Sequence, residues 1–161
     1  MAQIAAGLLM CRKENNELQF FLVHPGGPFY VKKNEGVWSI PKGIPENVEE
    51  LLETAQREFL EETGIQPTGP FHSLGSIKQK SGKVVHAWAF EGAWTSDQGI
   101  TSNIFKLEWP PRSKKLIDVP EVDRAEWMPY AKACTMIHPN QLPFFFFQAE
   151  DGIRDRSRHS C

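Results

Sequence analysis

The stretch of sequence that decides the fold runs from residue 43 to residue 65 and reads GIPENVEELLETAQREFLEETGI. Its apolar residues recur at the spacing of one helical face, which predicts an amphipathic helix; they are Val48, Leu51, Leu52, Ala55 and Phe59. Asn47 is the predicted N-cap, with Glu50 three residues later in the position of a capping box. Gly64 suits the left-handed backbone that often follows the last turn, so the helix is expected to end there.

Three acidic residues lie together on this helix. Glu58, Glu61 and Glu62 are spaced i, i+3 and i+4, so their carboxylates share one face beside the apolar stripe. Each like-charge pair at this spacing costs roughly a few tenths of a kcal/mol, and a divalent cation with oxygen ligands removes that repulsion. A glutamate-rich helix is, however, more often a solvated surface. The helix by itself leaves both interpretations open.

Arg57 lies among these acids. It follows Glu53 by four residues, in the favourable order for a helical ion pair, and it precedes Glu61 by four. A guanidinium in this place is expected to hold a neighbouring carboxylate in its orientation.

The complete spacing extends beyond one helix. Gly43 is followed after five residues by Glu49, and after seven more by the run Arg57-Glu58-Phe59-Leu60-Glu61-Glu62-Thr63-Gly64-Ile65. This pattern resembles the Nudix box, with one soft departure at Phe59, where a bulky aliphatic residue is commoner. The resemblance covers the chain from Ile4 to about Gln141. It implies the α/β (α+β) class, as an α/β/α sandwich in which a mixed β-sheet lies between helices.

The resemblance also implies roles for the box residues. The ligands of Mg²⁺, or of Mn²⁺ as the other candidate cation, are the carboxylates of Glu58, Glu61 and Glu62. The Gly43 carbonyl is a further candidate ligand. Arg57 counts with the three glutamates as a catalytic residue. Glu49 supports them, and Gly64 shapes the loop after the helix.

The chemistry that such a site performs is phosphoanhydride hydrolysis. The cation attracts the phosphates, polarises a phosphoryl oxygen and lowers the pKa of a bound water. A carboxylate then takes a proton from the water, which displaces a phosphate leaving group. The family often recruits this base, or an extra ligand, from outside the box. Glu121 is the first candidate and Glu108 the second, and an ordinary surface acid is the alternative for each.

The residues that lead into the box narrow the substrate. Pro41-Lys42-Gly43 is similar to the corresponding residues of Nudix members that cleave dinucleoside polyphosphates or other highly phosphorylated compounds. Lys42 is therefore predicted to pair with a phosphate away from the scissile bond. Weaker candidates for phosphate contacts are Arg112, Lys83 and His86. Candidates for stacking on a base are Trp38, Phe29, Tyr30 and Trp88, for each of which core packing is the alternative.

The leading hypothesis is a Mg²⁺-dependent pyrophosphohydrolase that acts on a dinucleoside polyphosphate or a nucleoside triphosphate. The second hypothesis among enzymes is a sugar-nucleotide or oxidised-nucleotide pyrophosphatase. A different class is a non-catalytic Nudix-fold regulator that binds a nucleotide without turnover. The intact Glu58, Glu61 and Glu62 argue against that class, because such modules often lose box acids.

Composition bounds the partners of the chain. Its 161 residues suit one domain, and its formal net charge of −2 indicates no basic surface for a nucleic acid polymer or an anionic membrane. No run approaches the roughly 20 apolar residues that span a bilayer. The three cysteines indicate neither a disulfide framework nor a zinc knuckle. A cytoplasmic protein is expected, and its oligomeric state is left open.

The rest of the chain reads mostly as strands, and the predicted Nudix domain spans residues 1–143. We expect strands at residues 4–10, 18–23, 37–40, 71–79, 83–91, 104–109 and 125–128, and a second helix near 130–138. Four consecutive phenylalanines, residues 144–147, then begin a segment without periodicity. Residues 144–161 are predicted to be a non-native or disordered tail, of the kind produced when a sequencing adapter is translated. A hydrophobic C-terminal anchor is the alternative.

Overall fold

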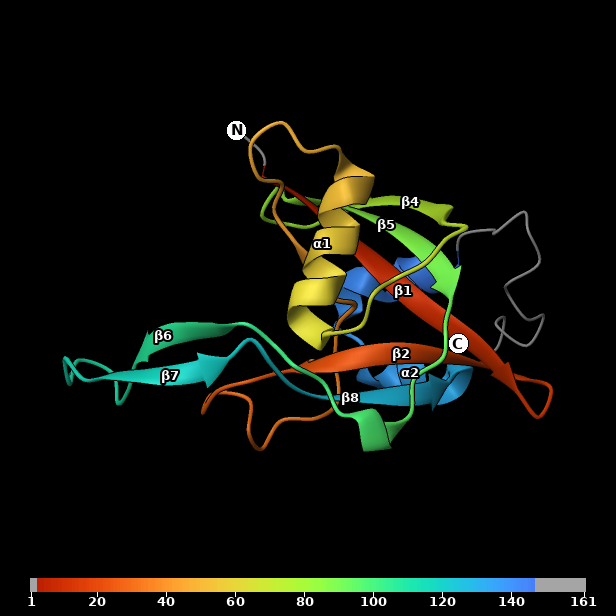
Figure 1. Cartoon of the computed structure of the whole chain (residues 1–161). Helices are drawn as coiled ribbons and strands as arrows, with labels where there is room; N and C mark the ends of the chain where they lie inside the picture. The colour runs from red at the N-terminus through yellow and green to blue at the C-terminus, as the bar shows by residue number, and fades with distance from the viewer. Residues whose placement is uncertain (1–2, 147–161) are drawn as a thin grey trace.

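The computed structural model describes residues 3–146, which form a mixed β-sheet with helices on both sides and a separate hairpin (Figure 1). The strands of the sheet are β1 (Ile4–Glu14), β2 (Glu17–Pro25), β3 (Lys42–Gly43), β4 (His72–Lys78), β5 (Val84–Glu91) and β8 (Val122–Pro129). Their order is β4-β5-β1-β2-β8, with β3 paired to β1. β1 runs parallel to β5, while the other neighbouring strands are antiparallel.

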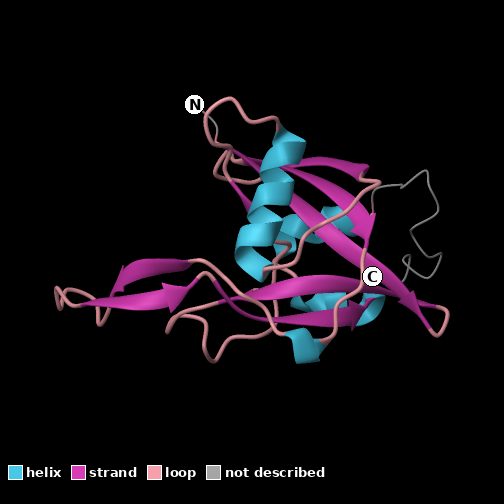
Figure 2. Cartoon of the chain, viewed as in Figure 1, coloured by secondary structure: helices cyan, strands magenta, loops and turns pink. Residues whose placement is uncertain are grey.

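Helices cover both faces of this sheet (Figure 2). They are α1 (Leu51–Thr63), α2 (Tyr130–Met136) and the short 3₁₀ helices η1 (Ser96–Gln98) and η2 (Pro139–Phe145). Side chains alternate along β1, so Leu8 packs in one core with Phe59 of α1, whereas Leu9 packs in the other with Ala133 of α2 and Phe144 of η2. The predicted α/β/α sandwich is confirmed. None of the described helices is long and apolar enough to cross a membrane.

A divergence between β1 and β2 makes room for the segment that leads into the box. The pairing of these two strands ends at Met10 of β1. Residues 38–43 enter the gap, where Ser39 bridges to β2 and Lys42 pairs with Gly7 of β1. A Cβ on Gly7 would lie 2.6 Å from a backbone oxygen of the inserted segment, so only glycine fits there. The box therefore starts from the interior of the sheet.

The helix α1 begins later than the sequence predicted. Asn47 is not the N-cap, because its backbone is left-handed, with a φ of 53°, and the chain turns there. Glu50 is the N-cap and forms a reciprocal capping box with Glu53. Val48 lies outside the helix, and its side chain is 97% exposed in place of joining the apolar stripe. The predicted end is confirmed, since Gly64 adopts the left-handed conformation with a φ of 80°.

Two other segments differ from the prediction. Within residues 37–40, Trp38 and Ser39 form isolated bridges in place of a strand. In contrast, β6 (Ile104–Glu108) pairs with β7 (Leu116–Pro120), a strand that the sequence pattern did not reveal. Most side chains of β7 are exposed, so no alternation of apolar and polar residues marks it. The two strands form a separate sheet that projects from the body (Figure 1), which we call the β6–β7 hairpin.

The folded chain continues past the predicted domain boundary after residue 143. Phe144 and Phe145 are 1% and 3% exposed and belong to the core on the α2 side of the sheet. The ring of Phe145 lies 4.8 Å from that of Phe20. Residues 147–161, most of the predicted tail, lie outside the described residues, and their origin stays a prediction.

Replacing Phe144 tests whether these phenylalanines stabilise the domain. We expect Phe144→Ala to lower the free energy of unfolding by about 3–5 kcal/mol, because it leaves a cavity in the core. Phe146→Ala makes the same change at a position that is 47% exposed, and should cost less than about 1 kcal/mol. Urea denaturation of both variants checks this. Equal, small effects would contradict a structural role for Phe144.

Candidate active site

Three carboxylates converge from two parts of the fold. Glu58 and Glu62 lie one turn apart on α1, and Glu121 directly follows β7. One carboxylate oxygen from each residue lies within 4.8 Å of the other two. Glu62 is buried, Glu58 is half-buried and Glu121 reaches the surface, so the group opens on one side. We call these three residues the acid cluster.

A short segment before β6 holds Glu121 against α1. The carbonyl of Asn103 accepts the backbone N–H of Glu121 at 2.8 Å. Asn103 is in turn bound to α1, because its backbone N–H donates to the Glu61 carbonyl at 3.1 Å and its amide to the Glu61 carboxylate at 3.3 Å. The N–H of Thr101 donates to the carbonyl of Thr63 at 2.9 Å. These bonds place Glu121 relative to the last turns of the helix.

Arg57 orients three carboxylates of the box, those of Glu49, Glu58 and Glu61. Its Nε and Nη2 donate to the two oxygens of Glu49 at 2.7 and 3.1 Å, a bidentate arrangement. Its Nη1 donates to Glu58 at 2.9 Å and to Glu61 at 3.2 Å. The hydrogen bond from Arg57 lowers the pKa of Glu49 to about 2, and the same bond raises the pKa of Arg57 above its ordinary value. Glu58 is thus held by a permanent cation on one side.

Gly43 lies directly against the carboxylate of Glu58. A Cβ at this position would be 2.0 Å from the carboxylate carbon, so any larger residue must displace it. Gly43 is fixed in β3 by its pairing with Ala6 of β1. The backbone of β3 therefore forms one wall of the acid cluster.

Crowding shifts the pKa of two acids upward. Burial is the largest cause for Glu62, followed by its hydrogen bond with Glu58 and by the charges of Glu58 and Glu121; together they raise its pKa to about 9. Burial also raises the pKa of Glu121, and the charges of Glu58 and Glu61 add to that effect. The positive charge of Lys42 opposes both shifts. Because every clustered donor is a carboxylate oxygen, the set fits a hard divalent cation such as Mg²⁺ or Mn²⁺.

Two adjoining cavities lie beside the acid cluster. The smaller, of about 220 Å³, is lined by Glu62, Glu121 and Lys42 among others. The larger, of about 290 Å³, is also lined by Lys42 and continues to Lys83 and Tyr30. Burial, and then the charge of Lys83, lower the pKa of Lys42, while the nearby carboxylates oppose this. Lys42 therefore stands between an acidic and a basic compartment of one cleft.

The remaining predicted phosphate contacts lie outside these cavities. His86 is on β5, where it pairs with Ala6 of the neighbouring strand, and it does not line the cleft. Arg112 lies in the loop that joins β6 to β7, at the end of the hairpin away from the body (Figure 1). Glu108, the second candidate base, ends β6, and its carboxylate accepts the backbone N–H of Lys114 at 2.8 Å. The structure does not bring these three residues to the acid cluster.

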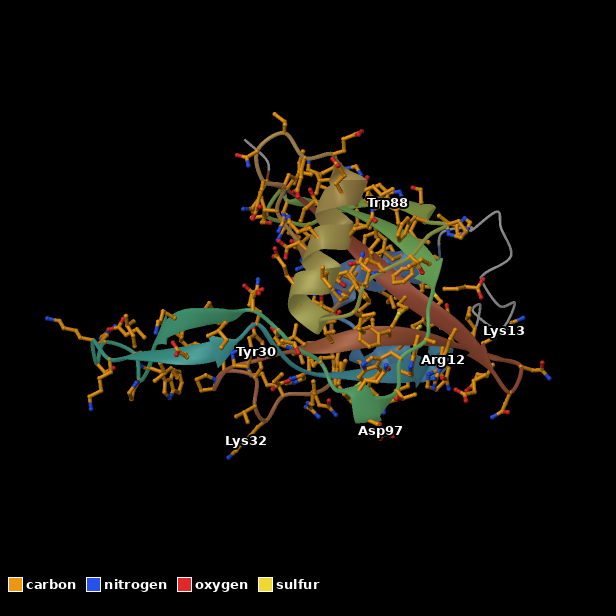
Figure 3. All side chains as sticks on the ribbon, viewed as in Figure 1. Arg12, Lys13, Tyr30, Lys32, Trp88 and Asp97 are labelled. Atoms are coloured by element: carbon orange, nitrogen blue, oxygen red, sulfur yellow. The ribbon has the colours of Figure 1, made fainter. Side chains whose placement is uncertain are left out.

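The four candidate stacking residues have different surroundings. Trp38 is 1% exposed, and its indole N–H donates to Asn34 at 2.9 Å, as expected for a core residue. Trp88 on β5 packs against the core on the α1 side, whereas Tyr30 lies on the loop after β2 (Figure 3). Phe29 is 54% exposed and its ring lies 5.0 Å from that of Trp109. Among the four, Tyr30 lines the cleft.

Comparison with known proteins identifies the family. The sequence model of the NUDIX domain matches residues 1–146. The chain belongs to the Nudix family. The expected family resemblance is thereby confirmed.

Several solved structures share the Nudix fold of this chain. The NUDIX domain of Shewanella oneidensis NrtR, complexed with ADP ribose, has a TM-score of 0.60 at 16% identity, over 89% of this chain and 86% of that one. The MutT protein from Methanosarcina mazei Go1 has a TM-score of 0.56 at 22% identity, over 90% and 91%. A binary complex of a C. elegans Ap4A hydrolase has a TM-score of 0.53 at 21% identity, over 83% and 84%. Comparison with curated protein sequences finds no match.

Reasoning from the Nudix box did not find the segment that places Glu121. Ser102 and Asn103 are polar residues in a loop, and nothing in their sequence pattern distinguishes them. In the fold, the Ser102 hydroxyl accepts the backbone N–H of Val122 at 3.0 Å, beside the bond between Asn103 and Glu121. Such backbone partners depend on tertiary structure, so no sequence signal was available.

Substituting Gly43 tests the close approach of β3 to Glu58. We expect Gly43→Ala to weaken Mg²⁺ binding by about 10–100-fold, because its methyl group displaces the carboxylate. Calorimetric titration with Mg²⁺ measures the change. Ile44→Ala, at the exposed neighbouring position, should bind the ion as the wild type does. Unchanged affinity in Gly43→Ala would show that this contact is not needed.

Glu62 is expected to leave a pH signature in the metal-free protein. The pKa of Glu62 in the folded state is about 9, above the ordinary value of 4.5. Between these two pH values, Glu62 is therefore protonated in the folded state and ionised in the unfolded chain. This contribution to stability is fully present below pH 4.5 and is lost as the pH rises toward about 9. In chelator, Glu62→Gln should therefore show a shallower fall in unfolding free energy across this range. Parallel urea-denaturation profiles would disprove it.

Proposed function

We propose that this Nudix protein hydrolyses a phosphoanhydride bond in a nucleotide that carries several phosphates, with Mg²⁺ as its cation. The proposal rests on the acid cluster, whose carboxylates meet beside a cleft that continues past Lys42 to Lys83. The substrates that fit best are a dinucleoside polyphosphate or a nucleoside triphosphate.

The acid cluster supplies the residues for the cation. Glu58 and Glu62 would hold it, with the Gly43 carbonyl as a further candidate ligand, while Glu121 keeps its carboxylate for the attacking water. Bound there, the ion supplies the positive charge that polarises a phosphoryl oxygen at the scissile bond. Glu61 stays a candidate ligand, although its carboxylate accepts hydrogen bonds from Arg57 and Asn103 outside the cluster. Arg57 keeps Glu58 in position, since its other contacts hold it to Glu49.

Glu121 is our choice for the general base. It is the member of the acid cluster that reaches the surface, where a water can approach. Its raised pKa increases the affinity of its carboxylate for a proton, as a base near neutral pH requires. The hydrogen bond from its backbone to Asn103 limits its movement while it takes the proton from the attacking water.

The two lysines favour a substrate with more than two phosphates. Lys42 can neutralise a phosphate next to the scissile bond, and Lys83 one further away. Because the charge of Lys83 lowers the pKa of Lys42, a polyanion between them relieves their repulsion. Tyr30 lines the same compartment and offers a ring to a base.

The alternatives make different use of these residues. A sugar nucleotide or oxidised nucleotide with a shorter phosphate chain would leave Lys83 without a phosphate partner. The regulator hypothesis draws on the fold shared with NrtR, whose structures include ADP ribose and, in another complex, a 27mer DNA. A regulator needs no general base, and the surroundings of Glu121 therefore favour turnover. A small nucleotide partner, no nucleic acid polymer and a cytoplasmic location are parts of our proposal.

Removing one acid tests turnover directly. We expect Glu62→Gln to lower the Mg²⁺-dependent rate of nucleotide hydrolysis by at least about 100-fold, because the variant loses a ligand charge at the centre of the cluster. Glu53→Gln makes the same change at an exposed position of α1 and should keep the wild-type rate. Phosphate and nucleotide products are measured with and without chelator. Turnover in chelator, or an unaffected Glu62→Gln, would refute the proposal.

The substrate class is tested with the same assay. Diadenosine tetraphosphate, deoxynucleoside triphosphates and ADP ribose are compared, with Lys83→Ala beside the wild type. The proposal expects Lys83→Ala to raise KM for the longer polyphosphates and to leave KM for the two-phosphate compound unchanged. A KM that Lys83→Ala leaves unchanged for every substrate would favour the shorter-chain alternatives, in which Lys83 has no phosphate partner.

A further inference from the structure

The β6–β7 hairpin presents a strand edge without a partner. Among residues 3–146, β6 pairs only with β7, and β7 only with β6. The hairpin also carries large exposed side chains, with Ile104 64% and Leu116 66% exposed. An open edge with apolar neighbours is a template for pairing with another chain. Figure 1 shows the hairpin extending away from the body, so the outer half of this edge is accessible.

The hydrogen-bond pattern shows which groups of β6 point outward. The N–H of Trp109 donates to the carbonyl of Lys115, and the N–H of Glu121 to that of Asn103. Bonded and non-bonded pairs alternate along an antiparallel ladder. The odd-numbered residues of β6 therefore bond to β7. The backbone N–H and C=O groups of Lys106 and Glu108 face away from β7.

We propose that β6 pairs antiparallel with β6 of a second copy of this chain, about a two-fold axis at Leu107. This register places Lys106 opposite Glu108 of the second copy, and Glu108 opposite Lys106 of the second copy. The outward backbone groups of these residues then form reciprocal hydrogen bonds across the axis. Opposite charges in directly facing positions stabilise such a pair, and like charges destabilise it.

In this register, each row of side chains carries charges of alternating sign across three of the four strands. Lys106 already forms an ion pair with Asp118 of β7, at 2.5 Å. Lys106 and Glu108 project from the same face of β6, since they are two residues apart. The order across the sheet is therefore Asp118, Lys106, then Glu108 of the second copy, with no like charges side by side. On the other face, Leu107 meets its own copy.

The outer edge of β7 is less suited to pair with β7 of a second copy. Pro120 of β7 has no N–H to donate, and proline on an edge strand opposes pairing. A self-pairing of β7 centred on Ile117 would place Asp118 opposite Leu116, which offers no charge complement. Pairing of β6 with β7 of a neighbour would be head-to-tail and would leave an unpaired edge at each end of a two-copy assembly. Pairing through β6 alone gives a closed dimer, and its bodies lie at opposite ends because the strands run antiparallel.

Two single charge-reversal variants, measured alone and mixed together, test this dimer. Lys106→Glu makes the β6 edge wholly acidic and Glu108→Lys makes it wholly basic, so each variant faces like charges in its own dimer. We expect each to raise the dimer Kd by about tenfold or more. An equimolar mixture of the two should dimerise again, because every acidic residue then faces a lysine. Sedimentation velocity of the full chain, over a concentration series, measures all three.

A control variant for this experiment lies in the same hairpin. Lys115→Glu makes the same charge change outside β6 and should dimerise as the wild type does. A wild type that stays monomeric at its highest soluble concentration overturns the proposal. So does a dimer that both single variants retain, or a mixture that does not recover. Circular dichroism and hydrolysis rates of each variant show whether the fold is intact.

Discussion

The rest of the structure depends on the convergence of three carboxylates at one point beside the half-buried Lys42. Like charges so close, and partly out of water, are unfavourable, and the raised pKa values of Glu62 and Glu121 express that cost. Protonation or a divalent cation removes it. A cation that binds here can replace the proton on a carboxyl group of the cluster. The bound cation then offsets the repulsion between the carboxylates and the phosphates of a substrate.

The sandwich holds these groups together through backbone contacts from distant parts of the chain. The divergence of β1 and β2 admits β3, and Gly43 brings its backbone against Glu58. Asn103 joins the last turns of α1 to the loop of Glu121. On the opposite side, Arg57 fixes Glu58 through a bidentate pair with a carboxylate earlier in the box. Glu58 and Glu121 are thus positioned by different parts of the chain, which explains why the cluster needs the complete domain.

The sequence predicted the helix, its acids and the sandwich because the box has a fixed spacing and a strong apolar period. The beginning of α1 was wrong, because Glu50 satisfies the helix terminus and leaves Asn47 in a left-handed turn. Strand β7 was missed, since a projecting hairpin buries too little to show a pattern. Glu121 was found as an acid in a loop, whereas the role of Asn103 rests on backbone hydrogen bonds that no local pattern encodes.

The most direct measurement is the release of protons when metal-free protein is titrated with Mg²⁺ in weak buffer at neutral pH. Because burial keeps Glu62 protonated in the absence of a cation, binding should expel about one proton for each ion bound. Saturable binding together with this acidification is the expected result. If Mg²⁺ causes no saturable change, or if it binds without releasing a proton, the acid cluster is not the place where this protein holds its cation.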